Sequence, residues 1–546
     1  MVHNAHRNHL RTTAVDVANS SWGDMCLKRL KLPLADCGLA TVAGFACLAF
    51  ACSANAFEGS TVERLAEAQT ELFAGRYDNA SSLYSKLLEE RPGEADAWYG
   101  LVRAELEAHH SAKAYAAAEQ ALAKAPQSAG AETAAGLGLY RKGDLTKAEA
   151  HFRAALAINP NYPGALRGLA SLYSAVSRPK TARDFRLLAY RQSPDDPELM
   201  VAYANTLRGP EHIAALEAAL LRIDPTTEQA RNLKVHIAND RAVGDRKLRR
   251  LVSPYQSTRI KLFQLLSGPQ RLRGVAVKVI LNQTESVKLM LDTGASGISV
   301  SPKFAEKAGL QVISGETSEA KGIGDRKPTA AVSYLASQLQ IGDVIFADYP
   351  VSVFRNAQSS NFDGLIGADV FARFLVKLDF PRFEISLEPR AVNAEADNET
   401  GPVDAGSPAP GFFRVYRFGD HLGIPTTIEG GRRGGHSALF LLDSGGSSNL
   451  IDTETAREST SVSEDSRITV TGIQGRVEKV SRAAQVTLIF AGFRQENPDL
   501  TSISLEKLGD SMGVGFGGIL GMPVLSRLAV TIDYREGTLK LEYKKP

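Results

Sequence analysis

Cysteine is nearly absent from this chain and is confined to one end of it. The four cysteines all lie before residue 57, at Cys26, Cys37, Cys47 and Cys52. The rest of the chain therefore cannot form a disulfide, use a thiolate as a nucleophile or bind zinc through cysteine. The ten histidines form no HExxH or comparable spacing, so the sequence predicts no metal site, and it predicts no cofactor.

An excess of charge of either sign is also missing. The 63 lysines and arginines nearly balance the 61 aspartates and glutamates, and the formal net charge is +2. We therefore expect no nucleic-acid partner. With 546 residues, of which 44% are hydrophobic and 23% are charged, the composition is that of a folded protein with several domains.

The amino terminus has the features of a processing segment. A basic cluster, Lys28–Lys31, precedes an apolar run, Cys37–Cys52, and Ala54-Asn55-Ala56 has the small-x-small pattern of a cleavage site. We predict that residues 1–56 are a signal peptide or leader; the run is short for a spanning helix, although an uncleaved leader would be a membrane anchor. A buried or disordered helix is the alternative. The leader predicts an exported protein, periplasmic or extracellular, and the lack of disulfides favours a bacterial envelope protein.

Residues 57–205 carry a repeat with a step of 34 residues. Two small or helix-ending residue types recur at this step, namely alanine at Ala80, Ala114, Ala148 and Ala182, and proline at Pro92, Pro126, Pro160 and Pro194. Alanine lets paired helices cross closely, and proline ends a helix because it lacks the backbone N–H. The pattern is typical of tetratricopeptide (TPR) repeats, which stack into a solenoid with a concave face. We expect a protein partner at that face, and capping helices with a linker at residues 206–254.

The second half of the chain contains one motif twice. Asp292-Thr293-Gly294 follows the apolar residues 287–291, and Asp443-Ser444-Gly445 follows residues 438–442. Each motif has the same companions downstream, which are a glycine-rich turn, an apolar-apolar-glycine element and a strand-like run that ends in aspartate and an aromatic residue. They lie at residues 322–324, 365–367 and 376–380 in the first copy, and at 472–475, 519–521 and 530–534 in the second. This internal duplication, rich in short β-branched runs, predicts two β lobes.

The duplicated motifs resemble those of the retropepsin and pepsin-like aspartic peptidases over about residues 255–546. The resemblance implies a first lobe at 255–390 and a second at 412–546. Residues 391–411 between them contain almost no large apolar side chain and are expected to be a flexible linker. The predicted fold class is thus a multidomain protein, an all-α TPR solenoid followed by an all-β two-lobed acid-protease fold.

The resemblance also assigns roles to the motif residues. It implies that Asp292 and Asp443 form a catalytic dyad. Two carboxylates a few ångströms apart cannot both ionise cheaply, so one acts as a base toward water while the other acts as an acid. Thr293 and Ser444 are expected to hydrogen-bond across to the opposite loop, and the glycine after each permits close approach. The resemblance places the flap, a hairpin that closes over bound peptide, at Gly322, Ile323 and Gly324 in the first lobe and at Gly472, Ile473 and Gly475 in the second.

These motifs predict an aspartic endopeptidase that hydrolyses peptide or protein substrates, and two alternatives stay open. The first is a catalytically inactive TPR scaffold or peptide-binding protein that keeps the protease fold. The fourth motif position is Ala295 in one lobe and Gly446 in the other, where many pepsin-like enzymes have serine. The second alternative is a dimer in which one lobe pairs with a lobe of another molecule, as in retropepsins.

Overall fold

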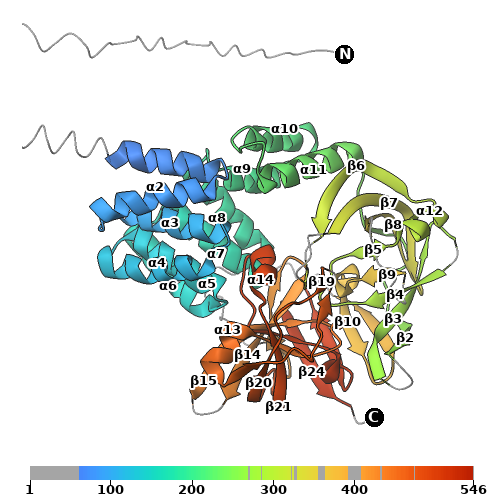
Figure 1. Ribbon diagram of the computed structural model, residues 1–546. Helices are drawn as coiled ribbons and strands as arrows, with labels where there is room; N and C mark the ends of the chain where they lie inside the picture. Colours follow the sequence, from blue (N-terminus) through green and yellow to red (C-terminus); the bar gives the residue numbers. More distant parts are fainter. Residues whose placement is uncertain are drawn as a thin grey trace, which may run out of the picture. The chain divides into compact units, whose positions relative to one another are not determined.

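Figure 1 shows the computed structural model, in which a helical region precedes a strand-rich region. The structure describes residues 61–544 except 268–270, 285, 321, 325–328, 355–362, 391–407, 431–432 and 473. The predicted leader, most of the predicted linker and the flap candidate Ile473 lie outside the described residues. Among the described helices, none combines the length and the apolar character that crossing a membrane requires.

The helical region is a series of paired helices. It begins with helical residues 61–73 and continues with α2 (Tyr77–Glu90), α3 (Ala95–Glu107), α4 (Ser111–Lys124), α5 (Ala129–Arg141), α6 (Leu145–Ile158), α7 (Pro163–Ala175), α8 (Pro179–Gln192), α9 (Pro197–Ala204), α10 (Gly209–Leu220) and α11 (Glu228–Val243). The four recurring alanines are fully buried, each with 0% exposure. The four recurring prolines follow the ends of α2, α4, α6 and α8, as expected for a residue that cannot continue the helical hydrogen-bond ladder.

The last helices, α9 to α11, share a small hydrophobic core that includes Ala204 of α9. Leu216 and Ala219 of α10 pack with Leu233 and Ile237 of α11, and all four are buried. The same α11 contacts strand β6 of the first lobe, where the Ser314 hydroxyl donates to Asn239 Oδ1 at 2.5 Å. The helical region is therefore joined to the β region by packing as well as by the chain.

The strands form two lobes with the same strand order. The first-lobe strands are β1 (Arg250–Leu251), β2 (Thr258–Ser267), β3 (Arg271–Leu281), β4 (Ser286–Leu291), β5 (Ile298–Val300), β6 (Gln311–Ala320), β7 (Thr329–Ile341), β8 (Val344–Phe354), β9 (Gly364–Ile366), β10 (Phe374–Asp379) and β11 (Glu384–Pro389). The second-lobe strands are β12 (Phe413–Arg414), β13 (Tyr416–Phe418), β14 (His421–Gly430), β15 (Arg433–Leu442), β16 (Leu450–Asp452), β17 (Val462–Glu464), β18 (Thr471–Gly472), β19 (Gly475–Arg476), β20 (Ser481–Phe490), β21 (Phe493–Ile503), β22 (Gly518–Leu520), β23 (Leu528–Asp533) and β24 (Thr538–Tyr543). The run β3-β4-β9-β5-β8-β7 in one lobe matches β14-β15-β22-β16-β21-β20 in the other. The duplication predicted from the motifs is thus present in the strand topology.

Short helical segments complete both lobes. They are α12 (Pro302–Lys307) and the 3-10 helix η1 (Ala368–Phe371) in the first lobe, and α13 (Thr453–Ser459), α14 (Glu506–Met512) and α15 (Met522–Leu525) in the second.

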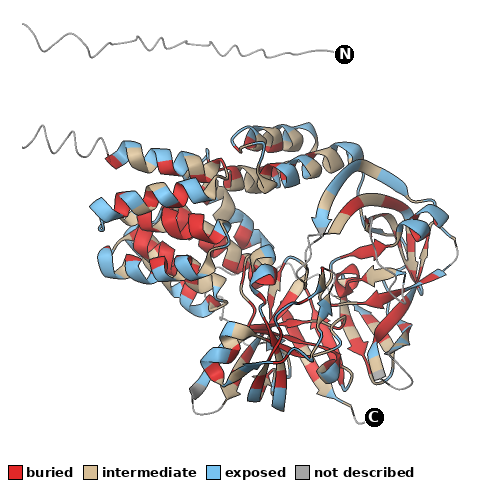
Figure 2. Cartoon of the chain, in the orientation of Figure 1, coloured by how far each residue is buried: buried red, intermediate tan, exposed pale blue. Residues whose placement is uncertain are grey.

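The two lobes are joined by strand pairing as well as by the chain connection. Strands β10 and β23 run antiparallel, with Val376 opposite Ile532 and Leu378 opposite Val530. Val376 and Val530 hold the same place in the two copies of the duplicated motif, so the pairing is symmetric about a point between the strands. One buried cluster contains apolar side chains from both lobes, and Figure 2 shows buried residues along many of the strands. The lobes are therefore fixed to each other by packing as well as by strand pairing.

Candidate active site

Each motif loop begins where a central strand ends. β4 leads to Asp292 and pairs in parallel with β9, while β5, which follows the loop, pairs with the other side of β9. β15, β22 and β16 repeat this arrangement around Asp443. The backbone N–H of Asp292 donates to the Ile366 carbonyl at 2.9 Å, and that of Asp443 donates to the Leu520 carbonyl at 3.0 Å. The apolar-apolar-glycine elements seen in the sequence therefore hold the start of each loop.

Thr293 and Ser444 lock the two loops together. The Thr293 hydroxyl donates to the Leu442 carbonyl at 2.8 Å and accepts the Ser444 N–H at 2.9 Å. The Ser444 hydroxyl donates to the Leu291 carbonyl at 2.9 Å and accepts the Thr293 N–H at 3.0 Å. The exposed fractions are only 2% for Thr293 and 0% for Ser444. Since buried polar groups are costly without partners, four mutually satisfying bonds fix the distance between the loops.

This lock brings Asp292 and Asp443 together within one chain. A side-chain hydrogen bond joins the two carboxyl groups. The Gly294 N–H donates to Asp292 Oδ1 at 2.8 Å, and the N–H groups of Gly445 and Gly446 both donate to Asp443 Oδ1 at 2.8 Å. Burial and the neighbouring carboxylate raise the pKa of Asp292 well above its usual range, and burial also raises the pKa of Asp443. The pair therefore retains a shared proton at pH values where an isolated carboxyl would lose it.

The glycines of the motifs sit where a side chain would meet a carboxyl group. A Cβ on Gly445 would lie 2.5 Å from Asp292 Cγ, and a Cβ on Gly294 would lie 3.0 Å from Asp443 Cγ. Each glycine thus leaves room for the aspartate of the opposite lobe. A side chain is tolerated less at Gly445 than at Gly294, because its Cβ would lie closer to the opposite carboxyl group.

The flap candidates of the two lobes contact each other. The Gly322 N–H donates to Gln474 Oε1, and the Gln474 N–H donates to the Ile323 carbonyl, both at 3.0 Å. Gly324 has a φ of 128° and lies against the Gln474 backbone, where a Cβ would approach the carbonyl carbon to 2.4 Å. Gly472 lies similarly against Ile323. Gln474 was not among the flap candidates predicted from the sequence. Those candidates were chosen for their glycines, and Gln474 is a polar residue next to Gly475.

His421 is a second residue beside the dyad that the sequence did not reveal. Its pKa is lowered by burial, and its ring interacts with Asp443 and with the Gly294 backbone. Its Nδ1 is buried and has no hydrogen-bond partner among the described residues. From the strand registers, the equivalent position in the first lobe is Gly274. The duplication therefore gave no signal for a side chain at this place.

Asp369, at the start of η1, supports the first loop from behind. Both of its carboxylate oxygens accept the Gly297 N–H, at 3.0 and 3.1 Å. Burial is the main reason that its pKa is raised to about 6. In the second lobe the amide of Asn449 has the related role, since its Oδ1 accepts the Gly521 N–H at 2.9 Å. The two lobes thus use different side chains to brace the same loop.

Comparisons with known proteins agree with this architecture. The chain matches a family model described as "Aspartyl protease" over residues 277–370 and 424–524, and two models described as "Tetratricopeptide repeat" over residues 72–136 and 133–197. The chain therefore carries an aspartyl protease family region preceded by tetratricopeptide repeats. The family match spans both Asp292 and Asp443.

Two solved structures were found to be similar to part of this chain. One is a thermophilic TPR protein from Thermus thermophilus, with 24% identity, coverage of 33% of this chain and 97% of that chain, and a TM-score of 0.25. The other is MamA, with 18% identity, coverage of 28% and 93%, and a TM-score of 0.19. A search of curated proteins found no match.

Proposed function

We propose that the protein is an aspartic endopeptidase that hydrolyses peptide bonds with Asp292 and Asp443. The observation that carries the proposal is the pair of hydrogen-bonded carboxyl groups, one from each lobe, that the Thr293 and Ser444 bonds hold at the junction of the lobes. Such a pair supplies an acid and a base at once, without a metal or a covalent intermediate. A second copy of the chain is not needed to bring the two aspartates together.

The reaction follows from the proton that the pair shares. The ionised carboxylate takes a proton from a water molecule, whose oxygen attacks the peptide carbonyl carbon. The protonated carboxyl gives its proton to the carbonyl oxygen, so a neutral tetrahedral intermediate forms. Collapse of this intermediate breaks the carbon–nitrogen bond: the proton taken from water passes to the leaving amine, and a hydroxyl of the intermediate returns a proton to the other carboxylate. The glycine after each aspartate leaves room for the carboxyl group of the opposite lobe, so the two groups can share a proton.

The flap contact and the repeats complete the proposal. The contact between Gly322 and Gln474 has to open for a chain to enter and can then close over it, which is the usual task of such lids. The repeats bind a protein partner at their concave face, in line with how stacked helical repeats act. We also propose that the leader directs export of the protein. The exported protein would then be periplasmic or extracellular, or anchored in the membrane if the leader is not cleaved.

The test is cleavage of an unfolded protein by the full chain from about pH 3 to about pH 8, beside the variants D292N and D443N. We expect each single variant to lose at least about 10³-fold in kcat, because neither remaining carboxyl can supply both acid and base. D343N is the matched control, since Asp343 lies exposed in the β7–β8 turn, and it should cleave like the parent chain. Full activity in either dyad variant would refute the mechanism. An inactive parent chain that still folds would favour the non-catalytic scaffold.

A further inference from the structure

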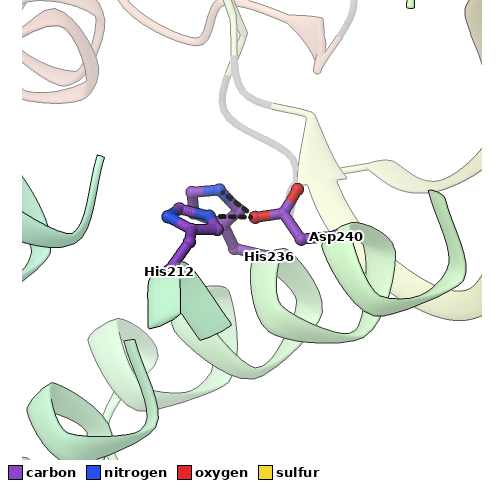
Figure 3. A group of neighbouring side chains, drawn as sticks. All are labelled: His212, His236 and Asp240. Atoms are coloured by element: carbon purple, nitrogen blue, oxygen red, sulfur yellow. Dashed lines mark hydrogen bonds and ion pairs between the residues drawn. The ribbon is translucent and has the colours of Figure 1, made fainter. Parts of the chain in front are cut away.

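Three metal-ligating side chains converge on the last two helices before the β region. His212 lies on α10, and His236 and Asp240 lie one turn apart on α11 (Figure 3). The Nε2 atoms of the two histidines lie 3.0 and 2.9 Å from the same carboxylate oxygen, Asp240 Oδ2. These three atoms all lie within 4.8 Å of one another. Within the described residues this is the group in which two imidazoles and a carboxylate meet.

The hydrogen bond on the far side of His212 fixes which of its nitrogens faces the cluster as a ligand. His212 Nδ1 lies 2.8 Å from the Ala204 carbonyl oxygen. A carbonyl can only accept, so Nδ1 carries the hydrogen and donates. In the neutral ring, Nε2 then presents a lone pair toward Asp240 Oδ2, which also presents lone pairs. Two facing lone pairs at 3.0 Å repel unless a proton or a cation lies between them.

We propose that His212 Nε2, His236 Nε2 and Asp240 Oδ2 bind one divalent transition-metal ion of the zinc type. Two imidazoles and one carboxylate are a donor set that zinc accepts, and a water completes four ligands. Bonds of about 2.0–2.1 Å in a tetrahedron put ligand atoms about 3.3 Å apart. Each histidine nitrogen therefore lies a few tenths of an ångström closer to Asp240 Oδ2 than such a site requires. A metal-binding histidine commonly donates its other N–H to a backbone carbonyl, as His212 does to Ala204.

The exposure of the three side chains fits an ion that enters from solvent. The exposed fraction is 18% for His212, 44% for His236 and 32% for Asp240. His212 is thus held inside, while the other two leave one side open for entry and for a bound water. The two rings lie 6.3 Å apart between centroids at an angle of 61°. They are not stacked on each other, so each nitrogen can point at a common centre.

The simpler interpretation is a set of ion pairs without a metal. Other histidines of the chain form such pairs with a carboxylate. His151 lies 2.7 Å from Glu132, and His110 lies 2.8 Å from Glu105. Each is one imidazole with one carboxylate, and a second imidazole is what sets the α10–α11 cluster apart. This cluster could not be recognised from the sequence, because His212 is far from His236 along the chain and only the H-x-x-x-D spacing on α11 is local.

The bound ion would link α10 to α11 through His212 on one helix and His236 and Asp240 on the other. The residue before Asp240 is Asn239, which accepts the hydrogen bond from Ser314 of β6. β6 is the strand that leads toward the flap candidate Gly322. The ion would therefore stiffen the helix on which the base of this hairpin rests, while taking no part in the chemistry at the dyad.

The experiment is a titration of the full, metal-stripped chain with Co²⁺ at fixed neutral pH, read by visible absorption, followed by displacement with Zn²⁺. The four cysteines are first alkylated, because they all lie in the leader and would bind metal themselves. We expect one equivalent of Co²⁺ with the absorption of a nitrogen- and oxygen-ligated tetrahedral ion. H236Q and D240N should each weaken this equivalent by at least about 30-fold, because changing even a residue that only supports a metal ligand typically costs about 10–100-fold in affinity.

His151 provides the matched control, because H151Q removes a histidine that also pairs with a carboxylate. It should bind like the parent chain. His236 is exposed enough for H236Q to fold, and far-UV circular dichroism checks this. Equivalents that H236Q retains belong to other sites and are subtracted. The proposal fails if the parent chain and H236Q bind the same number of equivalents with the same affinity.

Discussion

The bonds between the motif loops give the sharpest stability prediction. Thr293→Ala removes a hydroxyl that donates to Leu442 and accepts from Ser444 inside the protein. One carbonyl and one N–H then stay buried without a partner, and each costs about 1–3 kcal/mol. The expected loss in the free energy of unfolding is thus about 2–6 kcal/mol. Thr293→Ser keeps the hydroxyl and removes one methyl group, so it should lose only about 1 kcal/mol.

Urea unfolding followed by near-UV circular dichroism measures this difference for the chain as a whole. The two tryptophans are Trp22, in the predicted leader, and Trp98, on α3 of the repeats. Tryptophan fluorescence therefore does not report the β region and should shift little between variants. Hydrogen exchange adds a local measurement, because the amide of Ser444 should exchange much faster in Thr293→Ala than in Thr293→Ser. Thr293→Val has nearly the shape of threonine without the hydroxyl and should behave like the alanine variant. Equal stability of the serine and valine variants would refute the account of the lock.

Two further predictions concern the surroundings of the dyad. Gly445→Ala should reduce cleavage more than Gly294→Ala, because the new Cβ would lie 2.5 Å from Asp292 Cγ against 3.0 Å from Asp443 Cγ; equal activity of the two variants would contradict it. Asp369→Asn tests a pKa that burial raises to about 6, against 3.8 for the unfolded chain. The stabilisation from such a group is fully present below about pH 3.8 and is lost as the pH rises through about 6. The total loss in the free energy of unfolding is up to about 3 kcal/mol. The free energy of unfolding of the parent chain should therefore fall relative to Asp369→Asn between about pH 4 and about pH 7, and parallel pH curves would exclude this.

The sequence predicted the parts of the site that depend on local pattern. The repeated Asp-Thr-Gly and Asp-Ser-Gly loops follow strands in both lobes, and the structure brings Asp292 and Asp443 together. The 34-residue step correctly placed buried alanines and helix-ending prolines. These features are readable because each element is encoded by neighbouring residues with a fixed spacing.

The site residues that the sequence did not predict owe their positions to contacts between segments far apart in the chain. His421 has glycine at the equivalent place in the first lobe, and Gln474 meets Gly322 only because two hairpins approach each other. Asp369 braces the first loop, but its counterpart is an asparagine at a different point of the second lobe. In each case the two copies of the duplicated lobe differ, so a search for what they share could not find these residues.

Those differences have a consequence for the proposed chemistry. In a pair of identical lobes neither aspartate is distinguished from the other. Here the Gly446 N–H donates to Asp443 Oδ1 at 2.8 Å, and the nearby His421 also acts on Asp443. Both interactions favour the ionised form of Asp443, so we expect the shared proton to reside on Asp292. Under the proposed mechanism, Asp443 is then the base that activates water and Asp292 is the acid that protonates the peptide carbonyl. Fusion of the lobes in one chain permits this division, because each loop can acquire its own neighbours.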